Sequence, residues 1–173
     1  MRPLRVFIGD YRAAIQEAIA NGERDTVWQW KEAMHAELRK TPPDFEDVLP
    51  LLEEVRADPD LPIATYVFQA AKYELSRRYV PVLCEIVGSE RHAAWHVPAI
   101  ELLGELELPE AIPALRQALG YRWDESVFGN VPEAALEALR AIGTKEALSV
   151  IEDARHSDVL EVREAAAELI ERR

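Results

Sequence analysis

The sequence predicts an all-α protein, an α-solenoid of about five antiparallel helix pairs. Apolar residues recur at the spacing of amphipathic helices along most of the chain. Segments of similar pattern follow one another, and the 173 residues include only 7 glycines, which argues against a turn-rich β fold. Because one helix pair cannot bury both of its faces, such pairs are expected to stack into a single domain over residues 1–173.

The first pair is expected at residues 10–40, as a divergent N-terminal cap. Its first helix runs from Asp10 to Asn21 and its second from about Arg24 to Lys40. Trp28 and Trp30 are two residues apart and cannot share a helical face, so we expect one in the core and the other against a neighbour or in solvent.

Four later segments begin with one pattern: an apolar residue, usually a proline, any residue and a second apolar residue. Proline is tolerated there because the first turn of a helix has no acceptor for its missing N–H. The copies are Leu49-Pro50-Leu51-Leu52, Val80-Pro81-Val82-Leu83, Ile112-Pro113-Ala114-Leu115 and Leu148-Ser149-Val150-Ile151. They define repeats at 44–76, 79–104, 109–143 and 144–173, with second helices at about 61–76, 91–104, 131–142 and 158–171.

The repeat at 109–143 has the clearest helix boundaries. Asn130 is expected to cap its second helix, Pro132 lies in the first turn, and Gly143 follows the end. Alanines on this helix would let it lie close to its neighbours. For the first repeat, Thr41 or Asp44 is the expected cap.

These units resemble HEAT repeats, particularly the short bacterial type first noted in phycobilisome lyases. The consensus of that type reads E-A-(I/V)-P-x-L followed by V-R-x-x-A-x-x-A-L-x-x-(I/L)-G. The match is good over 109–173, fair over 79–104 and loose over 44–76. Val162-Arg163 occupies the Val-Arg position, whereas Pro132 and Ala93 stand where that arginine is expected in the two preceding repeats. The resemblance implies a right-handed, curved stack that binds a ligand far more often than it catalyses a reaction.

The charge is strongly acidic and unevenly distributed. The net charge is −12, yet residues 1–43 hold 7 Lys and Arg against 6 Asp and Glu. An acidic body repels phosphate backbones and anionic membranes and would favour a basic partner, although acidity can also serve solubility alone. The single cysteine, Cys84, and the lack of a signal-like apolar run predict a cytoplasmic protein.

Few residues suggest chemistry. His92 and His96 have the i, i+4 spacing of metal ligands on one helix face, but no third ligand is evident, so a buried, hydrogen-bonded pair is the favoured interpretation. Cys84 lies among apolar neighbours and is expected in the core. No nucleophile or phosphate-binding motif is present, and we therefore expect no catalytic residue, no metal and no cofactor.

Two groups of residues are candidates for binding a partner. The loop 121–129 is long for this repeat, and its aromatic and arginine residues are of the types that dominate interfaces; it could equally fold back on the chain. The second group is acidic and lies on the later second helices, where it is either a solvated face or a surface for Lys and Arg. The loop candidates are Tyr121, Arg122, Trp123 and Phe128, and the acidic candidates are Glu133, Glu137, Glu161, Glu164 and Glu168.

The sequence thus favours a non-enzymatic protein–protein interaction module that binds a basic protein. An immunity- or antitoxin-like inhibitor and an adaptor both fit this description. The alternative is a phycobilin-lyase-like protein, or another HEAT protein that holds a small molecule. The charge argues against a nucleic-acid ligand.

Overall fold

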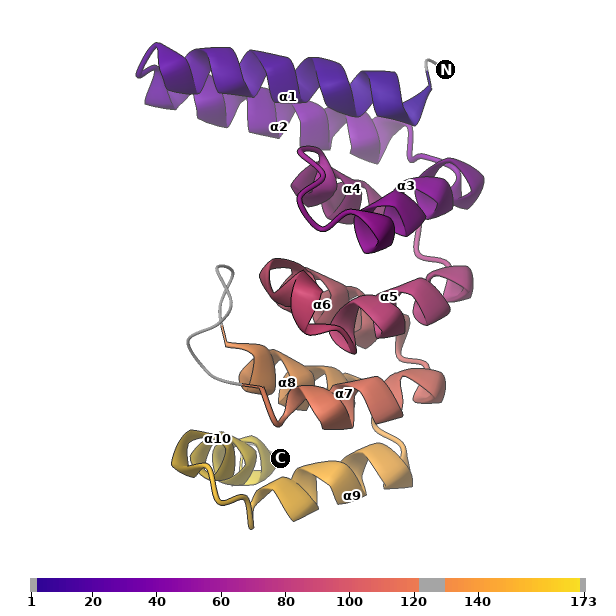
Figure 1. Cartoon of the computed structure of the whole chain (residues 1–173), viewed down its shortest axis with the longest axis vertical. Helices are drawn as coiled ribbons and strands as arrows, with labels where there is room; N and C mark the ends of the chain where they lie inside the picture. The colour runs from indigo at the N-terminus through magenta and orange to yellow at the C-terminus, as the bar shows by residue number, and fades with distance from the viewer. Residues whose placement is uncertain (1–2, 122–129, 172–173) are drawn as a thin grey trace. The chain divides into compact units, whose positions relative to one another are not determined.

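The computed structural model describes residues 3–121 and 130–171 as an all-α solenoid (Figure 1). The described residues contain ten α-helices, which follow one another as antiparallel pairs. The chain divides into two compact units, Met1–Leu75 and Ser76–Arg173, called here unit 1 and unit 2.

Unit 1 contains two helix pairs. The first consists of α1 (Leu4–Ala20) and α2 (Arg24–Lys40), and the second of α3 (Phe45–Ala57) and α4 (Ala64–Ala71). The expected start of the first helix at Asp10 was wrong. Its apolar stripe continues toward the N-terminus through Leu4, Phe7 and Ile8, which are buried.

Trp28 and Trp30 also differ from expectation, because neither lies in the core. Their exposed fractions are 64% and 40%. The buried positions of α2 are Met34 and Leu38. The ring of Trp30 packs edge-on against Tyr11 of α1, with 5.9 Å between centroids.

Unit 2 contains three helix pairs. They are α5 (Val80–Val87) with α6 (His96–Leu106), α7 (Ile112–Ala118) with α8 (Val131–Ile142), and α9 (Lys145–Ala154) with α10 (Leu160–Glu171). The first helices of successive pairs contact one another, and so do the second helices, α6 with α8 and α8 with α10. The middle pair, α7 with α8, is therefore covered on both sides by a neighbouring pair, as the interior of a solenoid requires.

Several expected helix ends are confirmed. The side chain of Asn130 accepts a hydrogen bond from the backbone N–H of Glu133 at 3.2 Å, and Asp44 caps α3 through the N–H of Glu46 at 3.0 Å. Gly143 follows α8 with φ of 64°, a left-handed conformation that glycine adopts without steric cost.

The helix expected at 91–104 begins and ends later than predicted. A short 3₁₀ segment, Glu90–Trp95, precedes α6, and His92 within it has non-helical φ and ψ of −103° and 22°. Pro98 explains the late start, since it has no N–H to bond the carbonyl four residues earlier. At the other end α6 continues past Gly104 to Leu106, and Glu107 adopts the left-handed conformation with φ of 53°.

At Gly104, α6 lies close against α8. A Cβ atom at this position would lie 3.1 Å from both Cα and Cβ of Ala138. The small residues on both helices thus permit a backbone approach that larger side chains would prevent. This contact fixes the separation of the two helices that form the site described below.

Candidate protein-binding groove

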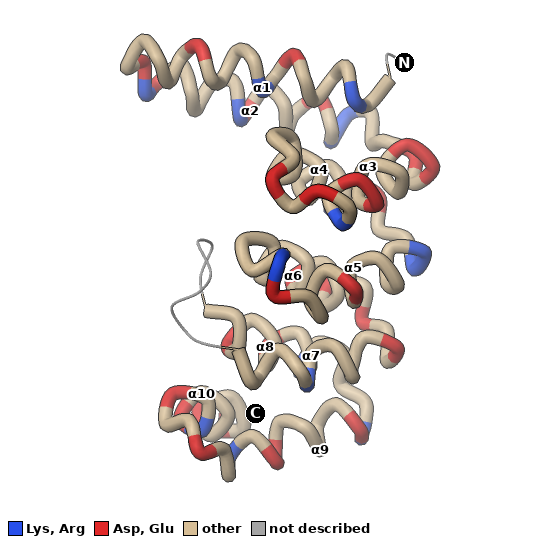
Figure 2. The backbone as a smooth tube through the Cα atoms, in the orientation of Figure 1, with Lys and Arg blue, Asp and Glu red and all other residues tan. Residues whose placement is uncertain are grey.

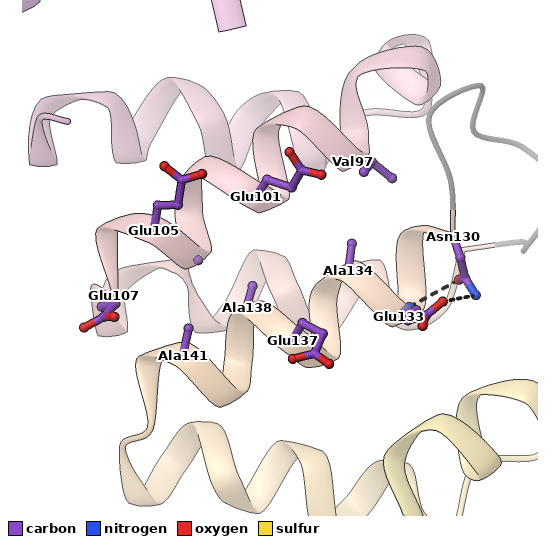
Figure 3. Close-up of a pocket in the computed structure, with 11 residues that line it drawn as sticks. Val97, Glu101, Glu105, Glu107, Asn130, Glu133, Ala134, Glu137, Ala138 and Ala141 are labelled. Atoms are coloured by element: carbon purple, nitrogen blue, oxygen red, sulfur yellow. Dashed lines mark hydrogen bonds between the residues drawn. The ribbon is translucent and has the colours of Figure 1, made fainter. Parts of the chain in front are cut away.

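A groove of about 590 Å³ runs along α6 and α8 within unit 2 (Figure 3). Its α6 wall consists of positions 97, 101, 104 and 105, which recur at helical spacing along one face. Its α8 wall extends from Asn130 at the N-cap to Ala141 in the last turn. The groove therefore follows the length of both helices.

The groove has an apolar floor and acidic edges. Ala134, Ala138 and Ala141 point from α8 toward α6 in Figure 3, and Gly104 lies opposite Ala138. Carboxylates border these small residues on both sides. They belong to Glu101, Glu105, Glu107, Glu133 and Glu137.

The α6 wall of the groove contains no basic residue of its own. The sequence contains no Lys or Arg between Arg91 and Arg116, a stretch that includes all of α6 (Figure 2). On α8, Arg140 forms an ion pair with Glu137 at 2.9 Å, between side chains that are both about two-fifths exposed. An exposed pair of this kind is weak and leaves Glu137 available to a competing cation.

The acidic surface continues toward α10. A narrower notch joins α8 to α10 and is lined by Glu133, Glu137 and Glu168. Three of the acidic residues selected from the sequence are thus brought together. Glu164 and Glu161 are exposed on α10 and line neither the groove nor the notch.

Tyr121 lies at a different place, beside the start of α6. Its ring stacks on the buried His96 ring with 4.7 Å between centroids. Its hydroxyl donates to the carbonyl of Val87 at 2.7 Å and accepts from Gln117 at 2.9 Å. Burial raises the pKa of Tyr121, which is half-buried. These contacts hold Tyr121 against its own chain, and a role in partner binding stays a prediction.

The remaining loop candidates, Arg122, Trp123 and Phe128, lie outside the described residues. Tyr121 and His96 line a hollow of about 370 Å³ together with Glu90 and Ala93. Of the four loop candidates, only Tyr121 is among the described residues, and its side chain contacts its own chain.

The profile of HEAT repeats matches residues 80–171, more than half of the chain and nearly all of unit 2. The chain belongs to the HEAT-repeat family. No curated protein and no solved structure matches it. HEAT repeats are generally protein-interaction modules. The groove lies within the part of the chain that the family match covers. Whether the repeats are of the phycobilisome-lyase type stays a prediction.

The two histidines of this HEAT-repeat chain do not form the expected helical pair. Both are buried, as predicted, but His92 lies in the 3₁₀ segment and His96 is the first residue of α6. His96 donates its Nε2 proton to the carbonyl of Ser89 at 2.9 Å. Within the described part of the chain, no group of three or more His, Cys, Asp or Glu side chains could hold a metal ion.

Sequence reasoning missed the α6 wall of the groove. Glu101 and Glu105 have the same four-residue spacing as Glu133 and Glu137, so an acidic i, i+4 pair on two successive second helices was the available signal. Glu107 could not be found this way, because its position depends on where α6 ends.

Unit 1 has an exposed apolar hollow that the sequence did not predict. It has a volume of about 450 Å³ at the turn between α1 and α2, where Ile19 and Trp28 are 54% and 64% exposed. The Nζ atom of Lys31 lies 5.3 Å from the centre of the Trp28 ring. In neither unit is a described helix long and apolar enough to cross a membrane.

Proposed function

We propose that this HEAT-repeat protein is a non-enzymatic interaction module whose groove between α6 and α8 receives a basic segment of a protein partner. The observation that carries the proposal is the arrangement of five glutamates along one groove. The notch toward α10 adds Glu168 and lengthens the acidic surface.

Electrostatics favour a cationic ligand at this place. The five carboxylates line one groove, so their fields add there, and the net charge of −12 strengthens the attraction over longer distances. Lysine and arginine have apolar stems and charged ends. Their stems can cover the alanines of the floor while their charged groups reach the glutamates at the edges.

The proposal is tested by capturing partner proteins on immobilised wild-type protein and on the Glu101→Gln/Glu105→Gln variant. Both residues are exposed on α6 and line the groove, so neutral replacements should leave the fold intact. We expect a partner retained by the wild type to be lost from the variant, and the retained partner to carry a basic segment.

A matched control removes two charges elsewhere in unit 2. Glu146 and Asp153 are exposed on α9 and do not line the groove. The Glu146→Gln/Asp153→Asn variant should retain the partner as the wild type does. Equal capture by the groove variant would contradict the proposal, and equal loss from both variants would reduce it to an effect of net charge.

A protein with such a groove could act in either of two ways, as an inhibitor or as an adaptor. An immunity- or antitoxin-like inhibitor would cover a functional site of a basic effector, whereas an adaptor would leave its partner active. The activity of the captured partner, measured with and without this protein, distinguishes the two.

A further inference from the structure

The groove can pair with the positive charges of a ligand, but it offers few hydrogen-bond partners for the backbone of an extended peptide. Its walls are α-helices, whose N–H and C=O groups bond within each helix. An extended peptide needs donors for its carbonyl groups when it is covered by a protein surface. The polar groups of the lining are mainly carboxylates, which only accept.

Asn130 is the one side-chain amide in the described lining of the groove, and its oxygen and one of its two N–H groups are already bonded. Its oxygen accepts from the N–H of Glu133 at 3.2 Å, and its nitrogen donates to the Glu133 carboxylate at 3.5 Å. A ligand that bonds its own backbone avoids this shortage of donors. An α-helix is such a ligand.

The spacing of the carboxylates also suits a helix. Glu101 and Glu105 on one wall, and Glu133 and Glu137 on the other, are each four residues apart. Four residues of an α-helix rise about 6 Å, so Lys or Arg at i and i+4 of a ligand helix would repeat at the same distance. The floor of Ala134, Ala138 and Ala141 is apolar and would contact a narrow apolar stripe on that helix.

We propose that the groove binds one basic amphipathic α-helix of a partner protein, with Lys or Arg on both sides of an apolar stripe. This inference rests on the proposed function and specifies the form of the basic segment. Charge complementarity sets the sign of the ligand, and the shortage of donors among the described lining residues sets its secondary structure.

Three synthetic peptides of about 18 residues test the inference, a length at which a helix can form in isolation. In the first, lysines four residues apart flank a stripe of alanine and leucine. The second has the same composition with lysines distributed around the helix, and the third is the first with a central proline. Affinity for the full chain is measured by fluorescence anisotropy, and helix gained on binding by circular dichroism.

We expect the first peptide to bind and to gain helix. The permuted peptide should bind roughly tenfold more weakly, and the proline peptide roughly tenfold to a hundredfold more weakly. Glu101→Gln/Glu105→Gln should reduce binding of the first peptide, while Glu146→Gln/Asp153→Asn should leave its affinity close to that of the wild type.

The outcomes separate the inference from the function on which it rests. If the proline peptide binds as well as the first, and binding still depends on Glu101 and Glu105, an extended segment is the ligand and only the helix inference fails. If no peptide binds, or the groove variant binds all three like the wild type, the proposed function fails as well.

Discussion

His35 and Tyr73 connect the first helix pair of unit 1 to the segment that follows the second. The Nδ1 atom of His35 and the hydroxyl of Tyr73 share a hydrogen bond of 2.6 Å. Burial lowers the pKa of His35 from its ordinary 6.5, and nearby Arg39 and Lys31 act in the same direction, whereas Glu32 raises it. We therefore expect His35 to make the stability of this unit depend on pH.

The direction of that dependence follows from the lowered pKa. The unfolded chain binds a proton at His35 more readily than the folded chain does, so stability is fully present above about pH 6.5 and is lost as pH falls through the folded pKa. Denaturant unfolding at several pH values should show a smaller loss in His35→Gln than in the wild type. Parallel pH profiles for the two proteins would contradict this prediction.

Cys84 is expected to be unreactive in the folded protein. It is half-buried on α5, and burial raises its pKa to about 11, so very little thiolate exists near neutral pH. A thiol reagent at about pH 7.5 should modify native protein far more slowly than urea-unfolded protein. Rapid modification of the native chain would show that α5 opens readily.

At the scale of elements, the contact between α6 and α8 should be sensitive to one methyl group. Gly104→Ala places a Cβ 3.1 Å from Ala138, so α8 must shift, and we expect a net loss of about 1–2 kcal/mol in the free energy of unfolding. The control is Gly9→Ala in α1, where a Cβ meets nothing within 4 Å. That substitution should stabilise the protein by up to about 1 kcal/mol, because alanine favours the helix.

The ends of α6 and α8 provide a reciprocal pair. Glu107 holds a left-handed φ of 53°, whereas Gly143 holds φ of 64° at the same position after α8. Glu107→Gly should stabilise by about 1 kcal/mol and weaken basic-peptide binding, and Gly143→Ala should destabilise by about 1 kcal/mol. Unfolding curves and peptide titrations measure both effects; a Glu107→Gly variant with unchanged peptide affinity would exclude Glu107 from the site.

Helix ends could be predicted from the sequence where capping residues, prolines and glycines agreed with the apolar spacing. Asn130, Pro132 and Gly143 mark both ends of α8, and the structure confirms them. The start of α6 was not predictable by helical spacing alone, because Pro98 removes a hydrogen bond that the spacing of His92 and His96 assumes. The sequence identified acidic residues on the α8 wall of the groove but not on the α6 wall, because the pairing of α6 with α8 is a tertiary contact.

At the scale of the whole molecule, the family match and the compact units coincide at the C-terminal part of the chain. The HEAT-repeat match covers residues 80–171, and unit 2 spans Ser76–Arg173. Repeat arrays derive their stability from neighbouring repeats. We therefore expect a 76–173 fragment to fold by itself, with helical circular dichroism and a cooperative urea transition. A fragment that is unfolded in buffer would contradict this expectation.

The close contact of Gly104 with Ala138 has a kinetic consequence. We expect α6 and α8 to keep this separation when a ligand binds, so that no opening step precedes the encounter. The association rate constant for a cationic ligand should then be set by diffusion and by attraction to the glutamates. It should fall steeply as salt is added, while the dissociation rate constant changes far less.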